Sequence, residues 1–182
     1  TILCVILVLI VLGAIAIGVP RFGFGYDIFE RGGWSAAEDG KLRYLKAGGE
    51  PVLGWMTMDG VTYYLDPEQG GAVYTGWLDT EEGRYYLSDT GAMHTGWLDT
   101  EDGRRYYRAD GPMALGWETI HGEHYYFDES GYMQTGWLHQ GEYSYYLQED
   151  GSAAVGPQVI DGEQRFFTPR GIHVVLVNVK NN

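Results

Sequence analysis

The chain has 182 residues, with 25 acidic and 12 basic side chains and a formal net charge of −13. So negative a surface repels nucleic acid and excludes it as a partner. The only cysteine, Cys4, lies in an apolar amino-terminal run, so disulfide bonds cannot hold the rest of the chain together.

Residues 2–19 contain no charged side chain, and Pro20 and Arg21 end this run. Eighteen residues in a helix span about 27 Å, close to the thickness of the hydrocarbon layer of a membrane. We therefore predict a transmembrane signal anchor over residues 1–20 and a juxtamembrane linker over residues 21–32. This places the protein in the cell membrane as a single-pass protein with the following residues on the extracellular, cell-wall side.

A cleaved signal peptide is the alternative interpretation of the same run. The small residues Ala14 and Ala16, separated by Ile15, have the spacing that signal peptidases require. Both interpretations predict that the remainder of the chain is exported.

A repeat of about twenty residues follows. Each copy begins with Gly-Trp, and the successive tryptophans are separated by 21, 22, 20, 20 and 20 residues: Trp34, Trp55, Trp77, Trp97, Trp117 and Trp137. Gly156-Pro157 continues the spacing without a tryptophan. Within a copy come a polar turn with glycine, a pair of aromatic residues, and a second turn with glycine.

This pattern predicts an all-β fold, a β-hairpin solenoid over residues 33–171. Tyrosine, tryptophan and leucine favour half-buried strands, and turns with Asp and Gly reverse the chain. One hairpin is marginally stable in water, but stacked hairpins bury aromatic rings of about 150–250 Å² each between them. The degenerate last copy is typical of a cap at the end of a repeat array.

The order Gly-Trp, glycine turn, Tyr-Tyr-Leu or Tyr-Tyr-Phe, glycine turn, Met-x-Thr-Gly-Trp resembles the cell-wall-binding repeats of the choline-binding and glucan-binding families. The resemblance implies a superhelical solenoid with ligands between consecutive hairpins. It implies a cell-wall polymer as partner (teichoic acid, glucan or peptidoglycan), no cofactor, and a binding rather than a catalytic role. The implied ligand-binding residues are Trp55, Tyr64, Trp77, Tyr86, Met93, Trp97, Tyr107, Met113, Trp117, Tyr126, Met133, Trp137 and Tyr146.

One position departs from the choline-binding pattern. In that family another aromatic residue, usually tryptophan, precedes the Tyr-Tyr pair. Here the position holds Thr62, Arg84, Arg105, His124 and Ser144. Because an arginine repels a quaternary ammonium group, this departure argues against choline in particular. Saccharide and choline-like groups of a wall polymer both stay open as ligands, with a saccharide or wall polymer preferred.

Residues 172–182 change character and are predicted to start a following, truncated domain. Their sequence, IHVVLVNVKNN, resembles the first strand of vancomycin-resistance-type D,D-carboxypeptidases, which are zinc enzymes that trim peptidoglycan. One alternative is therefore the targeting region of such an enzyme, whose zinc ligands would lie beyond residue 182. A passive spacer or adhesin is a further alternative. The repeats themselves show no catalytic or metal-binding set, and we interpret their acidic residues as solvated turns.

Overall fold

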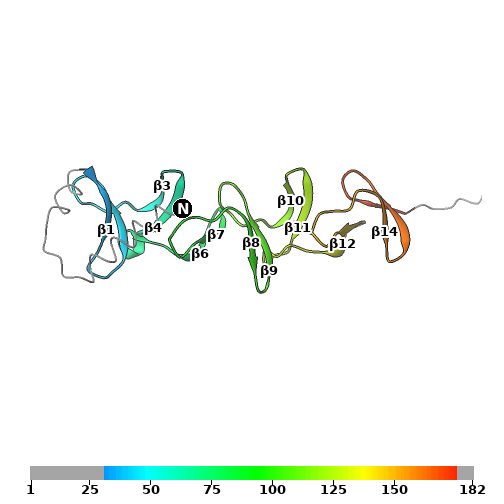
Figure 1. The fold of residues 1–182 in the computed structure, drawn as a ribbon, viewed down its shortest axis with the longest axis horizontal. Coiled ribbons are helices and arrows are strands. Elements are labelled where there is room, and N and C mark those ends of the chain that lie inside the picture. The colour runs from blue at the N-terminus through cyan, green and yellow to red at the C-terminus, as the bar shows by residue number, and fades with distance from the viewer. Residues whose placement is uncertain (1–30, 176–182) are drawn as a thin grey trace, which may run out of the picture. The chain divides into compact units, whose positions relative to one another are not determined.

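Short strands and tight turns form the part of the chain that the structure describes, residues 31–175 of a computed structural model (Figure 1). The strands are β1 (Gly33–Ala36), β2 (Leu42–Leu45), β3 (Gly54–Met58), β4 (Val61–Asp66), β5 (Ala72–Val73), β6 (Gly76–Thr80), β7 (Gly83–Leu87), β8 (Gly96–Thr100), β9 (Gly103–Tyr107), β10 (Gly116–Ile120), β11 (Glu123–Phe127), β12 (Gly136–Gln140), β13 (Tyr143–Leu147), β14 (Gly156–Ile160), β15 (Glu163–Phe167) and β16 (His173–Val174). One 3-10 helix, η1 (Pro67–Gln69), interrupts them.

The consecutive strand pairs define seven hairpin repeats within the described residues. We number them 1 to 7: residues 33–53, 54–75, 76–95, 96–115, 116–135, 136–155 and 156–174. They fall into two compact units, and the division passes through repeat 3. The residues up to Leu78 and the segment Tyr86–Met93 form the first unit. The segment Asp79–Tyr85 and the residues from His94 onward form the second unit.

The hairpins of repeats 1, 2 and 4 to 7 share the same antiparallel register at the Gly-Trp position. In repeat 5, Gly116 pairs with Phe127 and Trp117 pairs with Tyr126. Because side chains alternate between the two faces of a strand, the paired tryptophan and tyrosine side chains lie on one face of the hairpin. The apolar side chain that pairs with the glycine lies on the other face. This confirms the predicted all-β fold built from hairpin repeats, whereas the superhelical winding stays a prediction.

From repeat 2 to repeat 7, an apolar residue at or next to the end of the second strand supplies the core. These residues are at most 5% exposed from repeat 2 to repeat 7: Leu65, Leu87, Tyr107, Phe127, Leu147 and Phe167. Around Phe127, the buried Ala114 and Ile120 form a cluster that also receives rings from repeat 4. Each hairpin therefore contributes one large side chain to a small core that it shares with its neighbour.

Backbone hydrogen bonds join consecutive repeats in sequence. The Met133 amide donates to the carbonyl of Arg104 at 2.8 Å, and the next residue, Gln134, donates to Tyr126 at 2.8 Å. The first bond reaches the preceding hairpin and the second returns to the hairpin of the same repeat. Met93, Met113 and Ala153 donate in the same way to Thr62, Arg84 and His124. This pairing holds the stacking register without any side chain.

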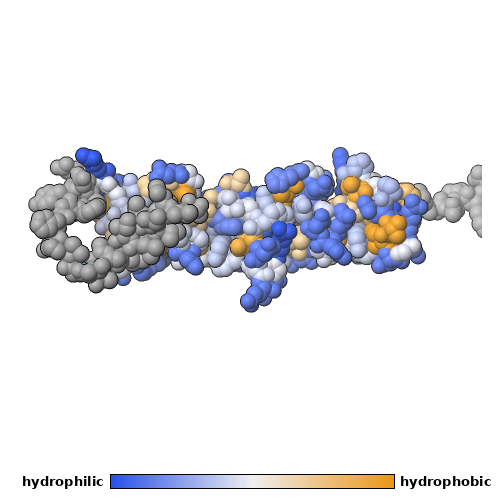
Figure 2. All heavy atoms as spheres, viewed as in Figure 1, coloured by the Kyte–Doolittle hydropathy of each residue, from blue (hydrophilic) through white to orange (hydrophobic). Residues whose placement is uncertain are grey.

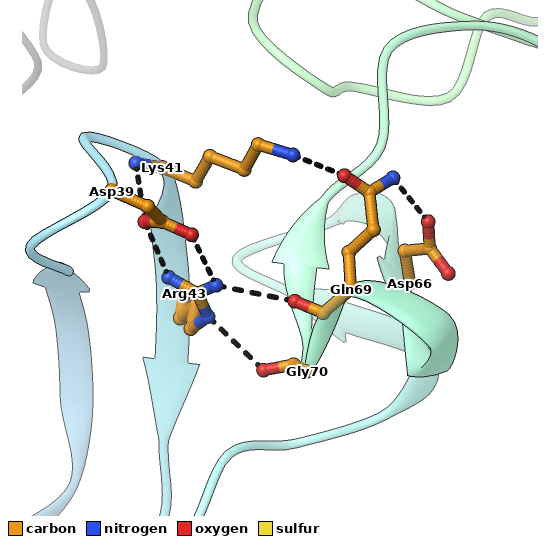
Figure 3. A network of polar contacts seen from close by, with 6 residues as sticks. All are labelled: Asp39, Lys41, Arg43, Asp66, Gln69 and Gly70. Atoms are coloured by element: carbon orange, nitrogen blue, oxygen red, sulfur yellow. Dashed lines mark hydrogen bonds and ion pairs between the residues drawn. The ribbon is translucent and has the colours of Figure 1, made fainter.

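Repeat 2 contains an enlarged second turn, which explains the spacing of 22 residues before Trp77. Asp66 caps helix η1 by accepting a hydrogen bond from the Glu68 amide at 2.9 Å. Arg43 of repeat 1 donates to the carbonyls of Gln69 and Gly70, at 3.2 and 3.1 Å, and its guanidinium forms two hydrogen bonds with Asp39 (Figure 3). The arginine thereby fastens the first hairpin to this turn.

Two adjacent glycines in that turn allow a matched test. A Cβ on Gly71 would lie 2.7 Å from the carbonyl oxygen of Val52 and 2.9 Å from the Cβ of Pro51, whereas one on Gly70 would meet nothing within 4 Å. Both residues have positive φ, so both alanine variants carry backbone strain. We expect Gly71→Ala to lower the unfolding free energy by about 3 kcal/mol and Gly70→Ala by about 1 kcal/mol. Urea denaturation measures both, and equal losses would contradict the close approach.

Two predictions concern the ends of the chain. No helix between residues 31 and 175 has the length and apolar character needed to cross a membrane. The predicted anchor over residues 1–20, and most of the predicted linker, lie outside the described residues. At the other end, β16 pairs with β15 and forms the third strand of the sheet that contains the last hairpin. The predicted domain start at residue 172 thus falls within this sheet, and residues 176–182 are not described.

Candidate functional site

A tryptophan and a tyrosine form a ring pair on one face of each of the first six hairpins. The ring centroids lie 5.0 Å apart for Trp55 and Tyr64, and 5.1 Å for Trp77 and Tyr86. The corresponding distance is 5.4 Å in repeat 5 and 5.3 Å in repeat 6. Most of these rings meet edge to face, the arrangement favoured by the aromatic quadrupole.

At Trp34, Trp97 and Trp117, the following repeat adds a second tyrosine against the tryptophan. Trp34 lies 5.1 Å from Tyr63 in the first unit. In the second unit, Trp97 lies 5.1 Å from Tyr125 and Trp117 lies 4.7 Å from Tyr145. The tryptophan is therefore flanked by two tyrosines, one from its own hairpin and one from the next. We call this arrangement a ring junction.

The tryptophans remain partly accessible although they contact several rings. Trp55, Trp77 and Trp137 are 40%, 39% and 37% exposed, and the others are half-buried. Full burial of every indole would have left only a structural role. Figure 2 shows the apolar residues of the viewed face in separate patches, with hydrophilic residues over much of the rest. Trp55, Trp77 and Trp137 thus present part of their rings to solvent.

Repeat 4 differs from the predicted alignment by one residue. Trp97 pairs with Tyr106, whose ring lies 5.0 Å away, and Gly96 pairs with Tyr107. Tyr107 is 0% exposed and occupies the core position that Phe127 holds in repeat 5. The residue equivalent to the tyrosines of the ring pairs is therefore Tyr106, not Tyr107. By the same register, the residue of repeat 4 that is equivalent to His124 in repeat 5 is Arg104, and not Arg105.

Met113 and Met133 lie beneath glycine turns, and Met133 also packs against the core cluster that Trp97 and Tyr106 contact. A Cβ on Gly131 would fall 2.4 Å from the sulfur of Met113, and one on Gly151 would fall 2.3 Å from the sulfur of Met133. Each methionine thus packs under the second turn of the following repeat. Met113 is 6% exposed, and Met93 and Met133 are half-buried. We assign Met113 and Met133 a packing role from this placement.

From repeat 2 to repeat 6, a polar pair stands two residues beyond the tryptophan. In repeat 5, Thr119 and His124 are joined by a hydrogen bond of 2.9 Å between the hydroxyl and Nδ1. Repeat 6 has His139 and Ser144 at 2.8 Å, and repeat 2 has two threonine hydroxyls at 2.9 Å. These pairs border the indole, so their chemistry decides what can approach it.

Repeats 3 and 4 carry an acid and an arginine at this pair. The Arg84 Nε lies 2.6 Å from Asp79 Oδ1, and the Arg104 Nε lies 3.0 Å from Asp99 Oδ1. The hydrogen bond from Arg84 lowers the pKa of the Asp79 carboxyl, and its positive charge acts in the same direction. Both repeats thus carry an ion pair, and in repeat 4 its guanidinium lies 4.5 Å from the centroid of the Trp97 ring.

Sequence reasoning missed several residues around the rings. The Trp117 Nε1–H donates to Gln140 Oε1 of the next repeat at 2.9 Å. The Arg165 guanidinium lies 5.8 Å from the Trp137 ring, in the place where Tyr145 meets Trp117 one repeat earlier. Arg105 stacks on Tyr132 at 3.8 Å. Within residues 31–175, no group of three His, Cys, Asp or Glu side chains is arranged to hold a metal ion.

Comparison with known proteins resolves which repeat this is. Residues 114–156 match the family described as "Choline-binding repeat". The solved structure of CbpJ from Streptococcus pneumoniae is 32% identical, with a TM-score of 0.72 over 80% of this chain and 54% of that one. The chain is a repeat protein of the choline-binding, cell-wall-binding type.

Two further structures of choline-binding repeat proteins from Streptococcus pneumoniae are similar. Choline-binding protein F, solved in the presence of a peptidoglycan analogue, is 30% identical, with a TM-score of 0.71 over 81% of this chain and 53% of that one. The modular autolysin LytC, solved in complex with a synthetic peptidoglycan ligand, is 26% identical, with a TM-score of 0.57 over 78% and 32% of the two chains. The chain spans about half the length of CbpJ and choline-binding protein F. A comparison with curated proteins found no match.

Proposed function

We propose that the repeats bind a polymer of the bacterial cell wall on their ring-bearing faces, as a non-catalytic module of an exported, membrane-tethered protein. The observation that carries the proposal is the recurrence of a partly exposed indole with its tyrosine neighbours in successive hairpins. Flat aromatic surfaces bind the apolar faces of sugars and the methyl groups of quaternary ammonium ions. Structures of two similar proteins with peptidoglycan-type ligands support a wall polymer as partner.

The spacing of the ring faces suits a polymer more than a single small molecule. Each hairpin offers one weak site, and a chain that engages several sites at once is bound far more tightly than any one group. The net charge of −13 argues against strongly anionic partners and favours neutral sugars or polymers that carry cationic groups.

Sedimentation with purified cell walls tests this function. We expect the full chain to pellet with walls from Gram-positive bacteria and to stay in the supernatant when walls are omitted. Soluble choline and soluble glucan fragments, added separately, then identify the chemistry, because only the group that fills the ring faces should release the chain. Absence of the chain from the wall pellet would contradict the proposal.

The carboxypeptidase alternative depends on residues that follow those described. It stays a prediction, as do the membrane anchor and the extracellular location. The spacer alternative differs in its expected result, because a passive spacer would neither pellet with walls nor respond to either soluble ligand.

A further inference from the structure

An arginine already covers the indole at the ring junction between repeats 4 and 5. Trp97 lies 5.0 Å from Tyr106 and 5.1 Å from Tyr125, with both tyrosine rings steeply inclined to it. The guanidinium carbon of Arg104 lies 4.5 Å from the centroid of the Trp97 ring. That distance is within the range of a cation–π contact.

Asp99 holds the arginine in this place. Its carboxylate oxygen lies 3.0 Å from Arg104 Nε, and the two residues face each other directly across strands β8 and β9. The positive charge also reaches the neighbouring repeat: burial raises the pKa of Tyr125, and Arg104 opposes that rise. The guanidinium therefore lies over the rings of the junction rather than in open solvent.

The next junction has the same rings without this arrangement. Trp117 lies 5.4 Å from Tyr126 and 4.7 Å from Tyr145. The residues equivalent to Asp99 and Arg104 are Thr119 and His124, which bond to each other. The two junctions thus form a natural comparison within one unit of the molecule.

We propose that Arg104 determines specificity by occupying the cation position on Trp97, so that the junction of repeats 4 and 5 rejects choline-like organic cations that the Trp117 junction accepts. A cationic ligand at Trp97 would have to displace a guanidinium that is both stacked and paired with Asp99, or lie beside a like charge. The inference rests on the proposed function only in treating the ring junctions as ligand sites.

Fluorine NMR of the full chain labelled with 5-fluorotryptophan can resolve the individual indoles. Trp97→Phe and Trp117→Phe variants assign the two signals, and choline chloride is the probe. In the wild type we expect choline to shift the Trp117 signal and to leave the Trp97 signal in place. In Arg104→Ser, which introduces the residue that repeat 6 carries at Ser144, we expect affinity at Trp97 to rise at least about tenfold.

Two more variants separate charge from shape. Arg104→Lys keeps the positive charge and should leave Trp97 unresponsive to choline. His124→Arg copies the repeat 4 arrangement into repeat 5 and should weaken choline binding at Trp117 at least about tenfold. Circular dichroism and the unaffected tryptophan signals confirm that each variant is folded.

The inference is overturned if choline shifts Trp97 equally in the wild type and in folded Arg104→Ser. It is overturned as well if that variant stays unresponsive, or if Trp117 does not respond in the wild type. Failure of the wild type to pellet with walls would instead overturn the proposed function. The two results are independent, because one measures a small cation at one indole and the other measures retention by a polymer.

Discussion

Replacement of Phe127 by alanine is expected to lower the free energy of unfolding by about 3–5 kcal/mol. The ring is 0% exposed and packs with Ala114 and Ile120 in the shared core of repeats 4 and 5. Trp97 lies 5.9 Å from it. Removal of the ring leaves a cavity between two hairpins, and a repeat array depends on its interfaces as much as on its single units.

Urea denaturation followed by tryptophan fluorescence measures this loss. Val159→Ala serves as the control, because Val159 is 75% exposed and its truncation should change stability by no more than about 0.5 kcal/mol. A loss below about 1 kcal/mol for Phe127→Ala would show that the shared core does not hold the hairpins together.

Much of the fold follows from the spacing of Gly-Trp and the two glycine turns. Alternation places tryptophan and tyrosine on one face, and the turn glycines adopt the positive φ that reverses the chain, as at Gly131. These are local properties, so the sequence predicts each hairpin well. Stacking depends on backbone bonds such as that from Met133 to Arg104, which join residues 29 positions apart and leave no sequence signature.

The error at repeat 4 has a specific cause. Matching the Tyr-Tyr pair by its letters selects Tyr107, because an additional arginine shifts the pair by one position. Counting from the tryptophan gives the correct residue: Trp55 and Tyr64 are nine positions apart, as are Trp97 and Tyr106. In a hairpin the turn type and loop length fix the register, so counting positions identifies the paired residue where matching letters does not.

The contacts that distinguish one ring junction from another were not predictable from the sequence. Arg104 could equally have extended into solvent, and its place over Trp97 depends on the rotamer that Asp99 stabilises. The methionines were expected beside the ligand, whereas Met113 and Met133 lie beneath glycine turns. Side-chain packing of this kind requires the three-dimensional neighbours to be known.

Removal of two accessible indoles should have the largest effect on binding. Trp117 and Trp137 belong to consecutive hairpins, and each pairs with a tyrosine of its own repeat. Aromatic anchors dominate most binding surfaces, and the loss of two linked sites reduces avidity more than the loss of either one. We expect the Trp117→Ala/Trp137→Ala double variant to bind walls at least about tenfold more weakly than the wild type.

The matched control removes two exposed apolar side chains that lie away from the ring pairs. Tyr143 and Val159 are 53% and 75% exposed, and Tyr143→Ala/Val159→Ala should pellet like the wild type. The decisive measurement is the fraction of each folded variant retained by purified walls over a range of wall concentrations. The account predicts selective loss in the double tryptophan variant, and equal retention of both variants would contradict binding through the ring-bearing faces.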